Sequence, residues 1–255
     1  MRVWRFWTKS NNFFFFLFFS HYPNIYILLD VNILCVSYTQ TNNIKLTGSE
    51  KMNEVPSCEN LDLIFVMDRS GSMSGSEEDT IGGFNSFIQR EKDKNLNTHV
   101  TTVLFDDQYE VLYKRKPINE VTELTGQEYW VRGCTALLDA IGMTITTLEK
   151  EIDNPVLFVI MTDGLENSSR EFSKEQIRNL IGNHKWEFIY IGADIDSYSE
   201  AGHLGIRKSR VANYRKTKEG FNEVFTSVSD ASEHLRAYHT LDESAWNKRL
   251  KKYDD

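Results

Sequence analysis

Hydroxyl and carboxylate side chains occur at three places where an apolar run ends or a new one begins. The first place is a D-x-S-x-S pattern made by Asp68, Ser70 and Ser72. The other two are a Gly-Cys-Thr segment that contains Thr135 and a Thr-Asp-Gly segment that contains Asp163. These five groups are hard oxygen donors, the set that Mg²⁺, Mn²⁺ or Ca²⁺ prefers and that zinc or copper does not. The chemistry that they could support is therefore the binding of a divalent cation.

Each segment also has a simple structural explanation. The D-x-S-x-S pattern is short enough to arise by chance, Asp-Gly is a common turn, and a threonine before an apolar helix is commonly its N-cap. Taken together, the segments favour a joint site. Two buried carboxylates that lie close together repel each other unless a cation lies between them. Because hydroxyls are neutral, they would leave much of the positive charge of the cation uncompensated. The cation could then attract a carboxylate from a partner.

Positioning these side chains requires an alternation of strands and helices from residue 60 onward. Short apolar runs predict strands over residues 61–67, 100–105, 109–113, 156–161 and 187–191. Apolar residues spaced three and four apart predict helices over residues 78–92, 135–152, 174–181 and 221–238. Residues 106–108 join the second and third strands as a hairpin, which predicts one antiparallel strand at an edge.

This alternation predicts an α/β fold with a doubly wound, mostly parallel central sheet, one antiparallel edge strand and helices on both faces. In such sheets ligands bind beyond the carboxyl ends of the strands. The polar segments at Asp68 and Asp163 follow predicted strands directly, and Thr135 opens a predicted helix. We therefore expect all three segments to meet at one edge of the sheet.

The same motifs resemble those of the von Willebrand factor A family. The segments at residues 68–72, 133–135 and 163–164 match the three parts of its metal-ion-dependent adhesion site, and the resemblance covers roughly residues 60–240. It implies a Rossmann-like fold and a bound Mg²⁺, with Mn²⁺ or Ca²⁺ as alternatives. It further implies that Ser70, Ser72 and Thr135 contact the metal directly, whereas Asp68 and Asp163 act mostly through water.

The first fifty residues differ from the rest of the chain. Seven of the 16 phenylalanines lie among the first twenty residues, and Arg2, Arg5 and Lys9 are close to them. The apolar runs are shorter than the roughly 20 residues of a spanning helix. We expect residues 1–51 to lie outside the domain, as a mis-called start, a secretion signal or a membrane anchor. A start at Met52 implies a cytoplasmic protein, whereas retention of the segment implies secretion or membrane attachment.

Composition limits the classes of partner. The chain has 255 residues with 29 basic and 37 acidic side chains, a formal charge of −8, which gives no support for nucleic-acid binding. Three cysteines are too few for a disulfide framework. From the resemblance we expect residues 52–240 to form a von Willebrand factor A domain, and residues 241–255 to form a charged tail.

Two further groups near the site have ordinary interpretations. Arg69 stands inside the D-x-S-x-S pattern, and we expect it to be a solvated side chain, with contact to an anionic partner as the alternative. Asp106 and Asp107 are expected only to make the hairpin turn.

Two classes of function follow from these residues. We favour a protein-binding module without enzymatic activity, whose Mg²⁺ grips an acidic side chain of a partner protein. The alternative is a Mg²⁺-dependent phosphoryl-transfer enzyme with Asp68 as nucleophile. In the haloacid dehalogenase group a second aspartate follows two residues later, but here that position is Ser70. No phosphate-binding G-x-x-x-x-G-K-[ST] motif is present either. A scaffold that binds no ion is the third alternative.

Overall fold

The computed structural model describes residues 60–241 and 246–254, and before them only the backbone of four strands. The chain divides into two compact units, Met1–Met52 and Asn53–Asp255. In the first unit the four strands form an antiparallel sheet in the order β1-β2-β3-β4. Their bounds are β1 (Val3–Phe6), β2 (Phe14–Leu17), β3 (Ile25–Asp30) and β4 (Ile33–Tyr38). The expected start at Met52 lies outside the described residues.

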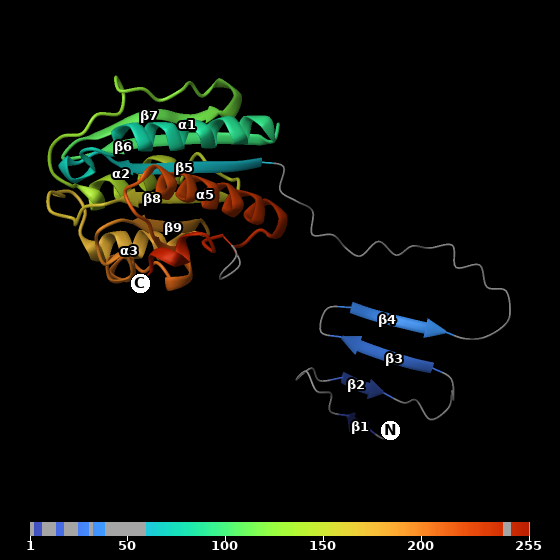
Figure 1. The fold of residues 1–255 in the computed structure, drawn as a ribbon. Coiled ribbons are helices and arrows are strands. Elements are labelled where there is room, and N and C mark those ends of the chain that lie inside the picture. Colours follow the sequence, from blue (N-terminus) through green and yellow to red (C-terminus); the bar gives the residue numbers. More distant parts are fainter. Residues whose placement is uncertain are drawn as a thin grey trace. The chain divides into compact units, whose positions relative to one another are not determined.

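The second unit is built on a six-stranded sheet with the order β10-β9-β8-β5-β6-β7 (Figure 1). All neighbouring strands are parallel except β7, which pairs with β6 in the antiparallel direction. This arrangement confirms the predicted doubly wound sheet with one antiparallel edge strand. The strands are β5 (Asn60–Asp68), β6 (Asn97–Phe105), β7 (Tyr109–Pro117), β8 (Val156–Thr162), β9 (Glu187–Gly192) and β10 (Val211–Asn213).

Helices cover both faces of this sheet because its central strands are apolar on both sides. In β5, Leu63 and Phe65 pack with α1 and α5, while Ile64 and Val66 pack with the helices of the opposite face. Successive strand residues point to opposite faces, so the continuous apolar run supplies both layers at once. The helices are α1 (Glu77–Asp93), α2 (Leu137–Leu148), α3 (Lys174–Asn183), α4 (Ser197–His203) and α5 (Lys218–Tyr238).

The structure also contains elements that the sequence pattern did not predict. Strand β10 has three residues and helix α4 has seven, and neither is long enough to show a clear period. The helix predicted over residues 135–152 is shorter in the structure, where α2 begins at Leu137 and ends at Leu148. Among the described residues, none of the helices has the length and apolar character needed to cross a membrane.

Candidate metal centre

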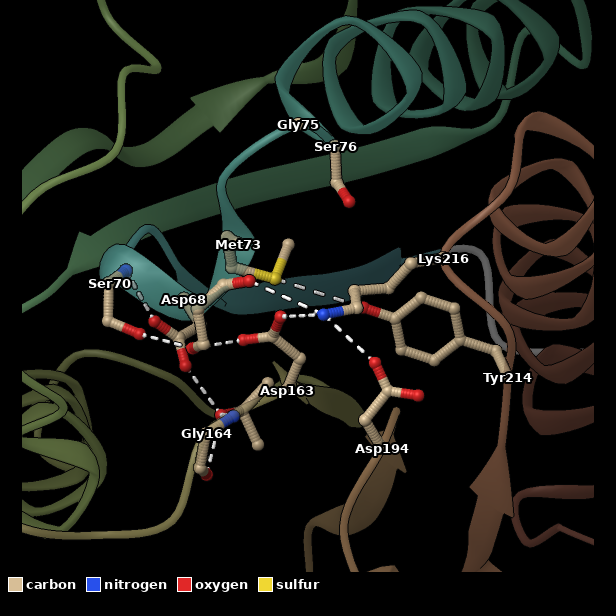
Figure 2. Close-up of polar contacts among 12 residues, drawn as sticks. Asp68, Ser70, Met73, Gly75, Ser76, Asp163, Gly164, Asp194, Tyr214 and Lys216 are labelled. Atoms are coloured by element: carbon tan, nitrogen blue, oxygen red, sulfur yellow. Dashed lines mark hydrogen bonds and ion pairs between the residues drawn. The ribbon is translucent and has the colours of Figure 1, made fainter.

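Asp68 ends β5 at the carboxyl edge of the sheet, and both of its carboxylate oxygens are engaged (Figure 2). Oδ1 accepts a hydrogen bond from the Ser70 backbone N–H at 2.6 Å, and Oδ2 accepts one from the Thr162 hydroxyl at 2.5 Å. The residue is 1% exposed. Burial raises the pKa of its carboxyl from 3.8 to about 6, although the hydrogen bonds from Thr162 and Ser70 oppose the shift.

The hydroxyls of Ser70, Ser72 and Thr135 converge beside Gly164. A β-carbon placed on this glycine would lie 2.7 Å from Thr135 Oγ1, 3.1 Å from Ser72 Oγ and 3.5 Å from Ser70 Oγ. The two serine oxygens are 3.0 Å apart, and the Ser72 hydroxyl donates to Asp163 Oδ1 at 2.5 Å. The structure therefore brings the five predicted site residues together, and only a glycine at position 164 leaves room for their oxygens.

Thr135 does not serve as the N-cap of α2, which was the structural alternative for this residue. The N-cap position is Ala136, which makes no side-chain cap. Instead Glu166 accepts a hydrogen bond from the Leu138 backbone N–H at 2.9 Å. The Thr135 N–H donates to Asn167 Oδ1, also at 2.9 Å. The Thr135 hydroxyl is thus left for the site, while the loop after β8 satisfies the start of the helix.

Backbone hydrogen bonds join the segments that carry the serines and the threonine. The Gly71 N–H donates to the carbonyl of Gly133 at 3.2 Å, and the Arg132 N–H donates to that of Arg69 at 2.9 Å. Gly133 has a φ of 65°, in the left-handed region that favours glycine. These contacts fix the distance between two segments that are about sixty residues apart in the chain.

Of the expectations for neighbouring residues, the one for Arg69 is wrong and the one for Asp106 is incomplete. Arg69 is 1% exposed, and its Nε lies 3.0 Å from Asp106 Oδ2, so it is neither solvated nor available to a partner. Asp106 does accept the hydrogen bond of the Gln108 N–H in the hairpin turn, but it also pairs with Arg132 at 2.7 Å. Burial opposes ionisation of Asp106, but the hydrogen bonds from Arg132 and Gln108 outweigh it and lower its pKa. A buried charge needs such partners, and no local sequence pattern reveals them.

Lys216 and Asp194 belong to the site but were missed in the sequence. Lys216 Nζ lies 3.1 Å from Asp163 Oδ2 and 2.9 Å from Asp194 Oδ2, as Figure 2 shows. The hydrogen bond to Asp194 raises the pKa of Lys216 above its ordinary value. Both residues follow strands of the parallel sheet, β9 and β10. The strand-end rule could have found Asp194, but Lys216 follows a strand too short to predict.

The residues present fit a small, hard cation. Two buried carboxylates and three hydroxyls offer only oxygen, the donor type that Mg²⁺, Mn²⁺ and Ca²⁺ prefer. The described residues contain no group of three or more His, Cys, Asp or Glu side chains placed to hold a metal. A site here would therefore rely on neutral hydroxyls, which distinguishes it from a carboxylate-rich calcium site or a zinc site.

Comparisons with known proteins agree with the fold. No protein family model matches the chain, and no curated protein is similar to it in sequence. Among solved structures, the vWF domain of the type V pili tip protein Mfa5 from Porphyromonas gingivalis matches with a TM-score of 0.50. The identity is 11%, and the match covers 67% of this chain and 95% of that domain. The chain has the von Willebrand factor A fold.

Two further solved structures are similar to the chain in fold. Proximal thread matrix protein 1 from the mussel byssus matches with a TM-score of 0.52 and 18% identity over 66% of this chain. The PilB minor pilin from Streptococcus sanguinis matches with a TM-score of 0.56 and 11% identity, over 94% of this chain and 79% of the pilin. The chain spans only 45% of the mussel protein. At these identities the likeness concerns the fold alone.

Proposed function

We propose that this von Willebrand factor A domain is a metal-dependent protein-binding module. Ser70, Ser72 and Thr135 would contact Mg²⁺ directly, and Asp68 and Asp163 would act through water. Mn²⁺ or Ca²⁺ could replace Mg²⁺. The observation that carries the proposal is the convergence of the three hydroxyl oxygens within 3.5 Å of one point beside Gly164. When bound, the cation would supply a positive charge to which an acidic side chain of a partner protein can bind.

The carboxylates support this division of roles. Both oxygens of Asp68 already accept hydrogen bonds from the protein, and Asp163 accepts the Ser72 hydroxyl and pairs with Lys216. Each of these oxygens can accept a second hydrogen bond, from a metal-bound water, so the acids would stabilise positive charge at the site without contacting the metal directly. Since the hydroxyls are neutral, a divalent cation would keep enough charge to bind a further carboxylate.

The alternative, phosphoryl transfer with Asp68 as nucleophile, is less well supported. A nucleophilic carboxylate needs an oxygen that can reach a phosphorus atom. Asp68 is 1% exposed, and each of its oxygens is held by a hydrogen bond at 2.6 Å or less. A binding role also agrees with the matched proteins, which by their names are a byssus matrix protein, a pilin and a pilus-tip protein.

The proposal is tested by affinity capture with the full chain as bait in a lysate of its source. We expect a partner to be retained in Mg²⁺ and released by EDTA. Ser70→Ala should abolish capture, whereas Ser74→Ala, an exposed serine in the same loop, should not. Capture that persists in EDTA, or that survives Ser70→Ala, would contradict the proposed function.

A further inference from the structure

Asp163 lies between the hydroxyl cluster and the positively charged side chain of Lys216. Its Oδ1 accepts the Ser72 hydroxyl at 2.5 Å, and its Oδ2 lies 3.1 Å from Lys216 Nζ. The two oxygens of one buried carboxylate therefore face the hydroxyl cluster on one side and an ammonium group on the other. Lys216 Nζ also donates to the carbonyl of Ser72 at 3.4 Å, which keeps it against the same loop.

The position of the ammonium is set by Asp194, the first charged residue after β9. Asp194 Oδ2 lies 2.9 Å from Lys216 Nζ, and the carboxylate is 64% exposed. Lys216 itself is 26% exposed, so its charge is partly shielded from water. Two residues before it, the buried Tyr214 places its hydroxyl 4.0 Å from the sulfur of Met73. The segment that carries Lys216 is thereby packed onto the segment that carries Ser72 (Figure 2).

We infer that Lys216 tunes the affinity of the site for divalent cations, with Asp194 setting the strength of this effect. The inference rests on the proposed function. Asp68 and Asp163 bring two negative charges to the site, and Lys216 offsets one of them at Asp163. A divalent cation and the ammonium compete for the same carboxylate, so the lysine weakens cation binding. Asp194 also attracts the ammonium, which reduces its hold on Asp163.

This tuning role predicts a different sign of effect from a structural one. If the ion pair only held the loops together, removing the lysine would loosen the site and weaken metal binding. If Lys216 competes with the cation, its removal strengthens metal binding. Opposite charges in a partly buried setting interact strongly enough for a change of about tenfold in affinity.

Lys94 provides a matched control at another place in the fold. It follows α1, and its Nζ also bridges two carboxylates, those of Glu91 at 2.6 Å and Glu233 at 2.8 Å. Its side chain is 20% exposed, similar to that of Lys216. Replacement of either lysine by methionine removes one charge and keeps the apolar stem.

The experiment is a titration of the full chain with Mn²⁺, with free Mn²⁺ measured by electron paramagnetic resonance. We expect Lys216→Met to bind about tenfold more tightly than the native chain and Lys216→Arg to restore native affinity. Asp194→Asn should bind several-fold more weakly, and Lys94→Met should match the native chain. Circular dichroism verifies that each variant is folded.

Two other results separate the inference from the function on which it rests. Equal or weaker Mn²⁺ binding by folded Lys216→Met, with native binding intact, would overturn the tuning role alone. Absence of Mn²⁺ binding in both the native chain and Lys216→Met would overturn the metal site and the tuning role together.

Discussion

The candidate metal centre depends on three hydroxyl groups, those of Ser70, Ser72 and Thr135. They carry no charge, and they lie within 3.5 Å of a common point. A cation held by them keeps most of its charge, unlike one surrounded by carboxylates. This property suits a site that binds an acidic group from another protein, because the partner supplies the missing negative charge.

Replacing Thr135 by valine tests this arrangement with little change in shape. The β-branched side chain keeps its volume, but the oxygen near the common point is lost. We expect the affinity for Mn²⁺ to fall by about tenfold or more, corresponding to about 1.4 kcal/mol. Thr146→Val on α2, where the hydroxyl donates to the Gly142 carbonyl, is the control and should bind Mn²⁺ normally. Isothermal titration calorimetry measures both, and equal affinity would argue against a ligand role for Thr135.

The raised pKa of Asp68 predicts a pH dependence of stabilisation by metal. Without metal, the folded chain binds this proton up to about pH 6, whereas the unfolded chain releases it near 3.8. Between these values the folded state holds more protons, so the contribution of Asp68 to stability falls as pH rises. Mg²⁺ offsets this loss where the carboxylate is ionised. We expect Mg²⁺ to raise the melting temperature clearly at pH 7.5 and much less at pH 5, and an equal rise would contradict this.

The five residues of the proposed site could be predicted from the sequence because each lies beside a recognisable strand or helix. Lys216 could not, since its contact with Asp163 depends on a packing contact between loops about fifty residues apart. The burial of Arg69 against Asp106 was likewise hidden, because a charged residue in a loop is normally solvated.

At the level of elements, the loop after β8 holds the start of α2 in place. The Glu166 carboxylate accepts hydrogen bonds from the backbone N–H groups of Leu138, Ser168 and Ser169. It thus acts as a cap supplied from outside the helix, and the macrodipole favours its negative charge there. The same loop contains Asn167, which fixes Thr135.

Glu166→Ala should therefore destabilise the domain and weaken its site at once. Loss of the cap is expected to lower the free energy of unfolding by about 1–2 kcal/mol. Mn²⁺ affinity should fall several-fold because the segment at Thr135 becomes less fixed. Urea denaturation and Mn²⁺ titration measure the two effects. Glu171→Ala, which removes an exposed acid from the same loop, should change neither quantity. A Glu166→Ala variant with native stability and native Mn²⁺ affinity would show that the loop does not support the site.

Gly164→Ala tests the space between the loops. The new β-carbon would lie 2.7 Å from Thr135 Oγ1, closer than carbon and oxygen normally approach. We expect Mn²⁺ binding to be lost while the circular dichroism spectrum stays native. Gly182→Ala, which would meet no atom within 4 Å, is the control and should bind Mn²⁺ normally. Native affinity in Gly164→Ala would show that the oxygens do not need this space.

The main elements of the fold were predictable because their apolar periods are long and clear. The apolar runs 63–67 of β5 and 156–161 of β8 are uninterrupted, and α1 and α2 show residues spaced three and four apart on their buried faces. Strand β10 was not predictable, because three residues carry no period and its place depends on pairing with β9. Segments of this length are stabilised by tertiary contacts more than by their own sequence.

At the level of the whole molecule, the residues of the candidate site lie at one edge of the sheet. Strands β5, β8, β9 and β10 are parallel, so the segments that follow them meet at the same end of the sheet (Figure 1). Residues from 68 to 216 thus reach one site while the cores on both faces hold the sheet rigid. This topology explains how side chains nearly 150 residues apart along the chain come together at one candidate site.

Direct measurement of metal stoichiometry tests this account most simply. The full chain is dialysed against Mn²⁺, and bound metal is counted in the native protein, in Ser70→Ala and after competition with Mg²⁺. We predict one Mn²⁺ per chain, displaced by Mg²⁺ and absent from folded Ser70→Ala. A native chain that retains no Mn²⁺, or a Ser70→Ala variant that retains as much as the native chain, would contradict the account.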